Sequence, residues 1–124
     1  MRRPSYVIIG ISLLLFASCG QQHQAKEVIQ AFVDEHVTEP ASRSSISIVK
    51  FDSTRVLNDS IIQAMRANAD TILRYSAKPI KYDESPARRK LYVARITYTI
   101  HGAEYSDTYY LDEQLSHVVA FKSN

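Results

Sequence analysis

Four side chains in the last third of the sequence have types and spacing suited to acid–base chemistry. Asp107 and His117 lie in two runs rich in β-branched and aromatic residues, and Tyr98 and Tyr109 lie in the same region. When these runs are paired as an antiparallel meander, Asp107 and His117 become diagonal neighbours on a mostly apolar face. Tyr98 then lies opposite Asp107, and Tyr109 lies opposite His117. A carboxyl and an imidazole in one apolar pocket would have shifted pKa values and could act as acid or base.

The same four residues also have a structural interpretation. Because an unpaired buried charge is costly, Asp107 would need a partner such as His117 or a tyrosine, and that pairing alone explains the set. Catalysis, ligand binding without chemistry and structural pairing are therefore three alternatives. An accessible cavity at these side chains would favour the first two, whereas a sealed core would favour the third.

Other residue patterns that carry out chemistry are missing from the sequence. The glycines at positions 10, 20 and 102 cannot form a glycine-rich phosphate loop. The four histidines are far apart and match no metal-binding motif, and no serine lies in a nucleophile elbow. We therefore expect no metal and no cofactor, and we expect a binding module rather than an enzyme.

The N-terminus has the parts of a secretory signal. Arg2 and Arg3 supply positive charge, and an apolar run over residues 7–16 follows them. This run is shorter than the roughly 20 residues of a typical membrane-spanning helix. It leads into residues 16–19, Phe-Ala-Ser-Cys, which resemble the lipobox of bacterial lipoproteins: a bulky apolar residue and two small residues before the cysteine. Cys19 is the only cysteine in the chain.

The lipobox resemblance implies that residues 1–18 are removed as a signal peptide and that Cys19 becomes a lipidated N-terminus. Several acyl chains on one residue hold a protein firmly at a membrane. Gly20, in place of Asp after the cysteine, implies sorting to the outer membrane, and the next four residues carry no acidic tag for export to the cell surface. We therefore expect a periplasm-facing outer-membrane lipoprotein, with a lipidated tether over residues 19–24 and one domain over residues 25–124.

Charge excludes one class of partner. The whole chain has a formal net charge of +2, but without Arg2 and Arg3 the basic residues equal the 13 acidic ones in number. A domain of zero net charge lacks the basic surface that general nucleic-acid binding requires. The partners that we expect are the membrane, through lipidated Cys19, and an envelope protein or glycan, with a homodimer as a further alternative.

Hydrophobic periodicity predicts two amphipathic helices and a mostly antiparallel sheet. Apolar residues recur at helical spacing over residues 28–37 and again over residues 61–73, where Asn58 or Asp59 can act as the N-cap. The predicted strands are residues 45–51, 91–100, 105–111 and 115–122, with a bulge in the first strand. The first turn lies within 101–104, as a loop of two or four residues, and the second is a three-residue loop at 112–114.

The predicted register gives the meander one apolar and one polar face. The apolar face would collect Tyr92, Ala94, Ile96, Tyr98, Ile100, Tyr105, Tyr109, Leu111, Leu115, Val119 and Phe121. The opposite face would be largely solvated, with only Leu91, Val93, Val118 and Ala120 apolar. A tyrosine on a polar face is suited to recognising a protein or a glycan. The candidate binding residues on this open face are Arg95, Thr97, Thr108 and Tyr110.

These elements predict an α+β fold in which two amphipathic helices pack on one face of a curved sheet ending in a three-stranded meander. Their order resembles the cystatin-like and NTF2-like folds, and small lipoproteins of gut anaerobes assigned to that group. NTF2-like enzymes place acid and base groups between helix and sheet, so the resemblance implies a pocket near Asp107 and His117. The turn at 101–104, His-Gly-Ala-Glu, does not match the Gln-Val-Val-type loop of cystatin inhibitors, which argues against protease inhibition.

The function expected from the sequence is therefore a lipid-anchored, noncatalytic binding or assembly module of the cell envelope. The alternative is a small NTF2-like enzyme or a ligand-binding pocket that uses Asp107 and His117.

Overall fold

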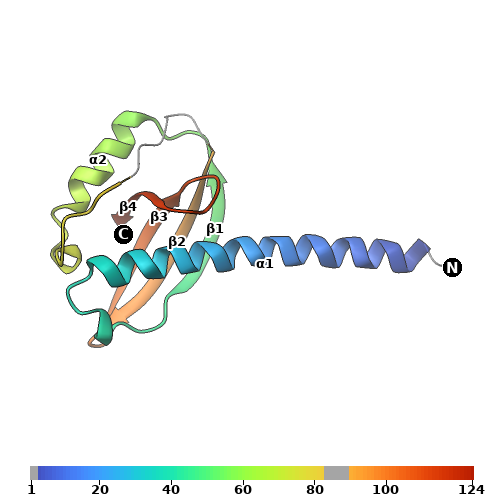
Figure 1. The fold of residues 1–124 in the computed structure, drawn as a ribbon, viewed down its shortest axis with the longest axis horizontal. Helices are drawn as coiled ribbons and strands as arrows, with labels where there is room; N and C mark the ends of the chain where they lie inside the picture. Colours follow the sequence, from blue (N-terminus) through green and yellow to red (C-terminus); the bar gives the residue numbers. More distant parts are fainter. Residues whose placement is uncertain (1–2, 83–89) are drawn as a thin grey trace.

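The chain forms two helices and one sheet in the order predicted from the sequence (Figure 1). The computed structural model describes residues 3–82 and 90–124, with side chains from residue 20 onward. The elements are α1 (Arg3–His36), β1 (Ser47–Thr54), α2 (Asp59–Ala69), β2 (Leu91–Ile100), β3 (Ala103–Leu111) and β4 (Val118–Ser123), with short 3-10 turns at Pro40–Ser42 and Leu73–Tyr75. The α+β class is confirmed.

The four strands form one antiparallel sheet in the order β1-β2-β3-β4, which does not close on itself. The β2–β3 hairpin turns through His101 and Gly102, whose φ angles of 50° and 79° are those of a type I′ turn. The β1–β2 register shifts between Ile48 and Lys50, which confirms a bulge in the first strand. The bulge brings Lys50 directly opposite Arg95 on β2.

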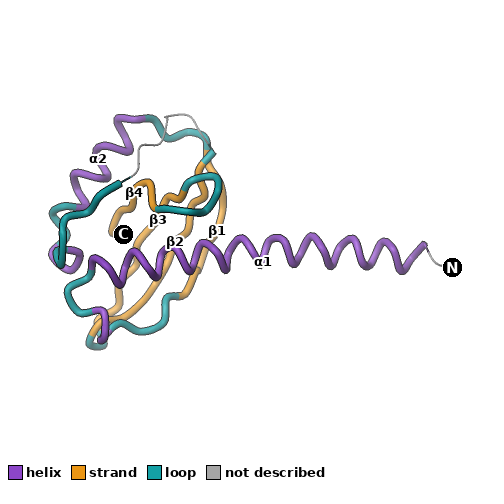
Figure 2. Tube along the Cα trace, viewed as in Figure 1, coloured by secondary structure: helices purple, strands orange, loops and turns teal. Residues whose placement is uncertain are grey.

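Helix α1 covers one face of the sheet and extends beyond it at its N-terminal end (Figures 1 and 2). Side chains of a strand alternate between the two faces, so alternate residues of β2 point toward this helix. The larger core lies between them and includes Ile29, Phe32 and Val33 of α1 and Val37 just after it, with Tyr92, Ala94, Ile96, Tyr98, Tyr109 and Phe121 of the sheet. The predicted apolar face of β2 is therefore confirmed.

Helix α2 begins as predicted, with the Asn58 side chain accepting a hydrogen bond from the Ile61 backbone N–H. Its main apolar contacts, however, belong to a second cluster, in which Ile62 and Met65 pack with Leu91, Val119 and Ala120. Leu91 and Ala120 alternate along their strands with residues of the larger core, so they lie on the opposite face of the pleat. The expectation that both helices pack on one face is wrong, because α2 covers part of the second face.

The predicted pairing of β2 with β3 is wrong at Asp107. Tyr98 pairs with Tyr105, and Asp107 pairs with Ile96. A turn of four residues would have put Tyr98 opposite Asp107, but the hairpin closes through two residues, so every later pair shifts by two positions. A shift of two keeps each side chain on its face, and Asp107 therefore still points into the core.

The predicted pairing of β3 with β4 is also wrong. Tyr109 pairs with Phe121 rather than with His117, and Asp107 pairs with Ser123. The turn is longer than predicted because the Asp112 side chain accepts hydrogen bonds from the backbone N–H groups of Ser116 and His117. Leu115 adopts a left-handed φ of 54° inside this turn, and β4 begins only at Val118.

Candidate functional site

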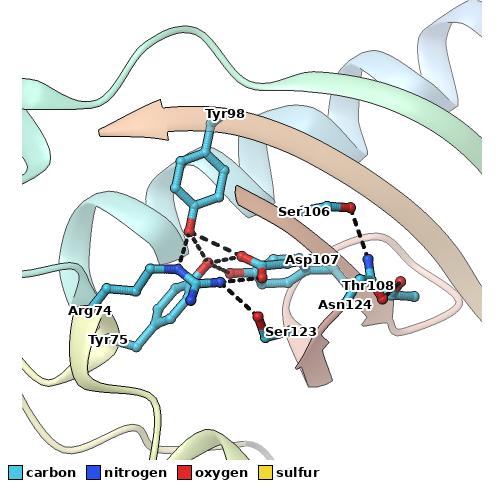
Figure 3. A network of polar contacts seen from close by, with 9 residues as sticks. Arg74, Tyr75, Tyr98, Ser106, Asp107, Thr108, Ser123 and Asn124 are labelled. Atoms are coloured by element: carbon cyan, nitrogen blue, oxygen red, sulfur yellow. Dashed lines mark hydrogen bonds and ion pairs between the residues drawn. The ribbon is translucent and has the colours of Figure 1, made fainter. Parts of the chain in front are cut away.

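Asp107 lies at the centre of a buried polar network (Figure 3). Asp107 is 0% exposed. Its Oδ1 atom forms an ion pair with Arg74, which lies in the turn after α2. The hydroxyl groups of Tyr75 and Tyr98 donate to Oδ2 over 2.6 and 3.0 Å. Tyr98 and Asp107 come from neighbouring strands, so the network joins three parts of the fold through one carboxylate.

Each of the three tyrosine hydroxyl protons in this network has an acceptor. Tyr75 and Tyr98 donate their hydroxyl protons to Asp107, and they accept hydrogen bonds from Tyr109 over 2.6 Å and from Arg74 over 3.1 Å. None of these atoms is among the buried polar atoms that lack a partner in the described part of the chain. Such complete satisfaction is what a buried charge needs in order to be tolerated.

The charge states are consistent with this hydrogen-bond assignment. Burial raises the pKa of Tyr98 to about 12 and the pKa of Tyr109 well above its usual value, so both hydroxyl groups stay protonated at neutral pH. Burial alone would lower the pKa of Arg74, but the Tyr98 hydroxyl and the Asp107 charge raise it, and the guanidinium stays charged. The network therefore favours the structural interpretation of Asp107.

His117 lies apart from this network. It follows the β3–β4 turn, with Nδ1 3.1 Å from the Ser116 hydroxyl oxygen and 3.7 Å from an Asp112 carboxylate oxygen. The structure thus brings Tyr98 to Asp107 and brings Tyr109 into the same network through Tyr75, but His117 is not part of it, and the predicted Asp107–His117 pair does not form. The reason is the register of β4, which starts after His117 rather than including it.

Asp112 is the carboxylate that His117 meets, and it stabilises the turn. Burial would raise its pKa, but the Ser116 hydroxyl and the backbone N–H groups of His117 and Ser116 more than offset this, so the pKa is lowered from 3.8. A carboxylate with a lowered pKa stabilises the fold at pH values above its unfolded pKa. That contribution disappears as the pH falls through the folded-state pKa.

Replacing Asp112 with alanine is expected to lower the free energy of unfolding by about 1–2 kcal/mol at pH 7, because two backbone N–H groups lose their acceptor. The cost should shrink as the pH falls below the usual carboxyl range. Urea unfolding of both proteins at pH 7 and in steps down to about pH 3 measures this. Glu113→Ala, at the exposed next position, is the matched control. A cost that is independent of pH would contradict the carboxylate role.

His117 also lines an open groove of about 770 Å³ beside α1. The other polar side chains of the groove include Glu35, His36 and Lys78, and they already have partners. Glu35 forms an ion pair with Lys78, and the His36 ring nitrogen Nδ1 is 2.8 Å from the Phe32 carbonyl oxygen. Asp107 does not line this groove. The implied pocket therefore does not join the carboxyl and the imidazole.

The polar face of the sheet carries a row of basic residues that crosses all four strands. Lys50 on β1 pairs with Arg95 on β2, Arg95 pairs with Thr108 on β3, and Thr108 pairs with Lys122 on β4. Directly paired residues point to the same face. We call Lys50, Arg95 and Lys122 the cationic row, and all three are exposed.

Hydroxyl and amide side chains flank the cationic row on one side. Thr97 pairs with Ser106 in the adjacent row, and the Asn124 side chain donates to the Ser106 hydroxyl over 3.0 Å. The Thr108 hydroxyl donates to the Asn124 side-chain oxygen over 2.9 Å. A shallow groove of about 340 Å³ runs along this region, lined by Lys50, Asp52, Ser53, Thr54, Val93, Arg95, Thr108, Lys122 and Asn124.

The four candidates on the open face share one face, as predicted, but they differ in exposure. Arg95 is exposed, Thr97 is half-buried and Thr108 is buried. Tyr110 pairs with Val93 in the row beyond Arg95 and packs against the second apolar cluster, and its partial burial raises its pKa. Tyr110 is therefore in part a packing residue, whereas the three basic side chains of the cationic row are exposed.

Lys50 was not among the predicted site residues, although it completes the row. Simple alternation from Ile46 places Lys50 with the apolar residues, and only the bulge between Ile48 and Lys50 turns it to the open face. One signal in the sequence could have identified Lys50. The alternation of apolar and polar residues breaks within this strand, and a lysine at an apolar position indicates that the bulge lies before it. Lys122 was likewise not among the predicted binding residues.

Comparisons with protein-family models, curated proteins and solved structures found no match for this chain. Among the described side chains, those of residues 20–82 and 90–124, no three from His, Cys, Asp or Glu are grouped so that they could hold a metal ion. None of the described helices has both the length and the apolar character needed to cross a membrane.

Proposed function

We propose that this protein is a lipid-anchored lipoprotein of the cell envelope that acts as a noncatalytic binding module through the open face of its sheet. The cationic row carries this proposal: three exposed basic side chains lie in line across four strands, next to a shallow groove. Exposed charge in a line serves recognition better than stability, because exposed charges contribute little to folding. The proposed anchor is Cys19, at the outer membrane on its periplasmic side.

Helix α1 would hold the domain close to that anchor. Residues 20–24, expected to be a tether, lie within α1, and two of their side chains contact the sheet region. The Gln21 amide donates to the Tyr92 hydroxyl over 3.2 Å, and the Gln24 amide donates to the Leu115 carbonyl over 3.2 Å. With Cys19 acylated, only Gly20 separates the lipid from the first of these contacts.

The alternative functions receive less support. An NTF2-like enzyme using Asp107 and His117 would need these groups to converge, whereas one is sealed in the core and the other lies on a separate turn. A homodimer with the open faces together would bring the two cationic rows toward each other, which like charges oppose. A negatively charged partner would be attracted by the cationic row, and its binding does not require Asp107 and His117 to lie together.

The anchor is tested by mass analysis of the full chain extracted from the membranes of a bacterial host with two membranes. We expect cleavage before Cys19 and acyl chains on that residue, and Cys19→Ala should abolish both. Ser18→Ala is the matched control, since it keeps a small residue before the cysteine and should leave acylation intact. An unmodified Cys19 in the wild-type protein would refute the anchor.

The binding surface is tested with the same detergent-extracted protein, applied to isolated glycan, lipid and protein fractions of the envelope. We expect saturable binding to one fraction, weakened about tenfold by Arg95→Gln, which corresponds to the loss of one charged contact. Glu113→Gln, in the β3–β4 turn, should bind as the wild type does. Equal binding by wild type and Arg95→Gln would remove the open face from the proposal.

A further inference from the structure

We infer that the cationic row is a binding site for an acidic glycan, namely a polysaccharide that carries carboxylate groups along its chain. This inference rests on the proposed function of the open face and names the chemistry of its partner.

The cationic row is electrostatically unfavourable when nothing is bound. Lys50 lies directly opposite Arg95, and like charges in directly opposed positions destabilise a sheet. Lys50, Arg95 and Lys122 take part in none of the ion pairs formed among the described side chains, those of residues 20–82 and 90–124. An anion that bridges Lys50 and Arg95 would relieve this repulsion. The relief of repulsion would then contribute to the free energy of binding, in addition to the attraction between the anion and each side chain.

The shape of the row suits an extended chain rather than a single small ion. Neighbouring strands lie about 4.8 Å apart, so the Cα atoms of Lys50 and Lys122 are separated by roughly 14 Å across the sheet. All three basic residues line the shallow groove, together with Thr108, which lies between Arg95 and Lys122 in the row. A linear polymer lying across the strands can contact the three charges one after another. Once the first contact has formed, the others are intramolecular, so each of them raises the affinity of the whole chain.

The charge of the groove favours a sparsely charged polymer. Asp52 lines the groove beside the three basic side chains, so the side chains of the groove lining carry a net charge of two positive rather than three. Asp52 occupies the row adjacent to Lys50 and Arg95, where it would repel a second anionic group. A polymer with one carboxylate per sugar matches this arrangement better than a densely charged polyphosphate does.

The neighbouring side chains favour a sugar chain over a polypeptide. Thr97, Ser106 and Asn124 supply hydroxyl and amide groups that can both donate to and accept from sugar hydroxyls. Protein interfaces usually depend on large apolar anchors in deep pockets, and no large side chain of the groove lining is both apolar and exposed. Single-stranded nucleic acid would need exposed aromatic platforms, whereas Tyr110 packs against the second cluster.

The direct test is calorimetric titration of the detergent-extracted full chain with polygalacturonate. We expect saturable binding that weakens as salt is added, because screening reduces attraction between exposed charges. Lys50→Glu should weaken it at least about tenfold, since it removes one attraction and adds one repulsion. The same change should leave the melting temperature unchanged or slightly raised, because it replaces repulsion at Arg95 with attraction. Lys26→Glu on α1 is the charge-matched control and should bind normally.

Three comparison polymers separate this inference from its rivals. Neutral dextran should not bind, and poly-glutamate and inorganic polyphosphate should bind more weakly than polygalacturonate. Equal or tighter binding of any of these three would overturn the glycan assignment, as would the absence of polygalacturonate binding. If that assignment fails while an envelope fraction still binds in a manner that depends on Arg95, the proposed function stands without it.

Discussion

Replacing Asp107 with alanine is expected to lower the free energy of unfolding by about 3–5 kcal/mol, because it leaves the Arg74 charge without its carboxylate in a largely buried site. Two tyrosine hydroxyls lose their acceptor at the same time. Urea unfolding followed by circular dichroism measures the change. Since small domains are stable by only about 5–15 kcal/mol, Asp107→Ala could leave little folded protein. Asp107→Asn, which keeps one oxygen acceptor, then provides a milder variant of the same test.

Two controls connect this cost with the network rather than with acidic residues in general. Asp52→Ala removes an exposed carboxylate and should change the free energy of unfolding by no more than about 0.5 kcal/mol. Combining Asp107→Ala with Arg74→Met should cost less than the sum of the single changes, because the second removes the charge stranded by the first. A cost below about 1 kcal/mol for Asp107→Ala, or strictly additive effects, would contradict the network.

Replacing Phe121 with alanine should cost a similar amount, about 3–5 kcal/mol, through the loss of packing. Phe121 is fully buried and stacks on Tyr109 with ring centroids 5.0 Å apart and planes at 9°. It also meets Phe32 of α1 edge-on at 5.3 Å. The cavity would lie between helix and sheet, so α1 should loosen before the sheet unfolds. Hydrogen exchange of residues 25–37 is the direct measurement, alongside urea unfolding.

Phe121→Leu keeps most of the apolar volume and is expected to cost less than about 1.5 kcal/mol. Val56→Ala removes an apolar side chain that is 82% exposed, and it should be nearly neutral. If Phe121→Ala left the exchange of α1 unchanged, the aromatic contacts would not be what holds this helix on the sheet.

The buried network and the cationic row occupy the two sides of the same strand. Asp107 and Thr108 are successive residues of β3, so one points into the core and the other points to the open face. By holding β3 against the turn at Leu73–Tyr75, the Asp107 network also fixes the strand that separates Arg95 from Lys122. A residue first considered for acid–base chemistry thus contributes to the proposed site as a positioning residue.

Local pattern was sufficient for much of the fold. Apolar spacing identified the helix ending at His36 and the start of α2 at its Asn58 cap, and alternation separated the two faces of β2. These features depend on the side-chain repeat of a helix, about 3.6 residues, and of a strand, two residues. Both repeats can be recognised in a short stretch of sequence. The assignment of Arg95 and Thr108 to the open face followed from the same period of two. The lipidation of Cys19 remains a prediction from its motif.

Tertiary structure decided which residues meet. Alternation determines the face of a side chain but not its partner on the next strand, and turn hydrogen bonds to Asp112 shifted β4 so that His117 left the strand altogether. Arg74 and Tyr75 reached Asp107 from a distant turn because a buried carboxylate requires donors from whatever element packs there. The bulge beside Lys50 completed the cationic row. Residue types and faces are local properties of this chain, whereas its candidate site depends on long-range register and on the pairing of buried charge.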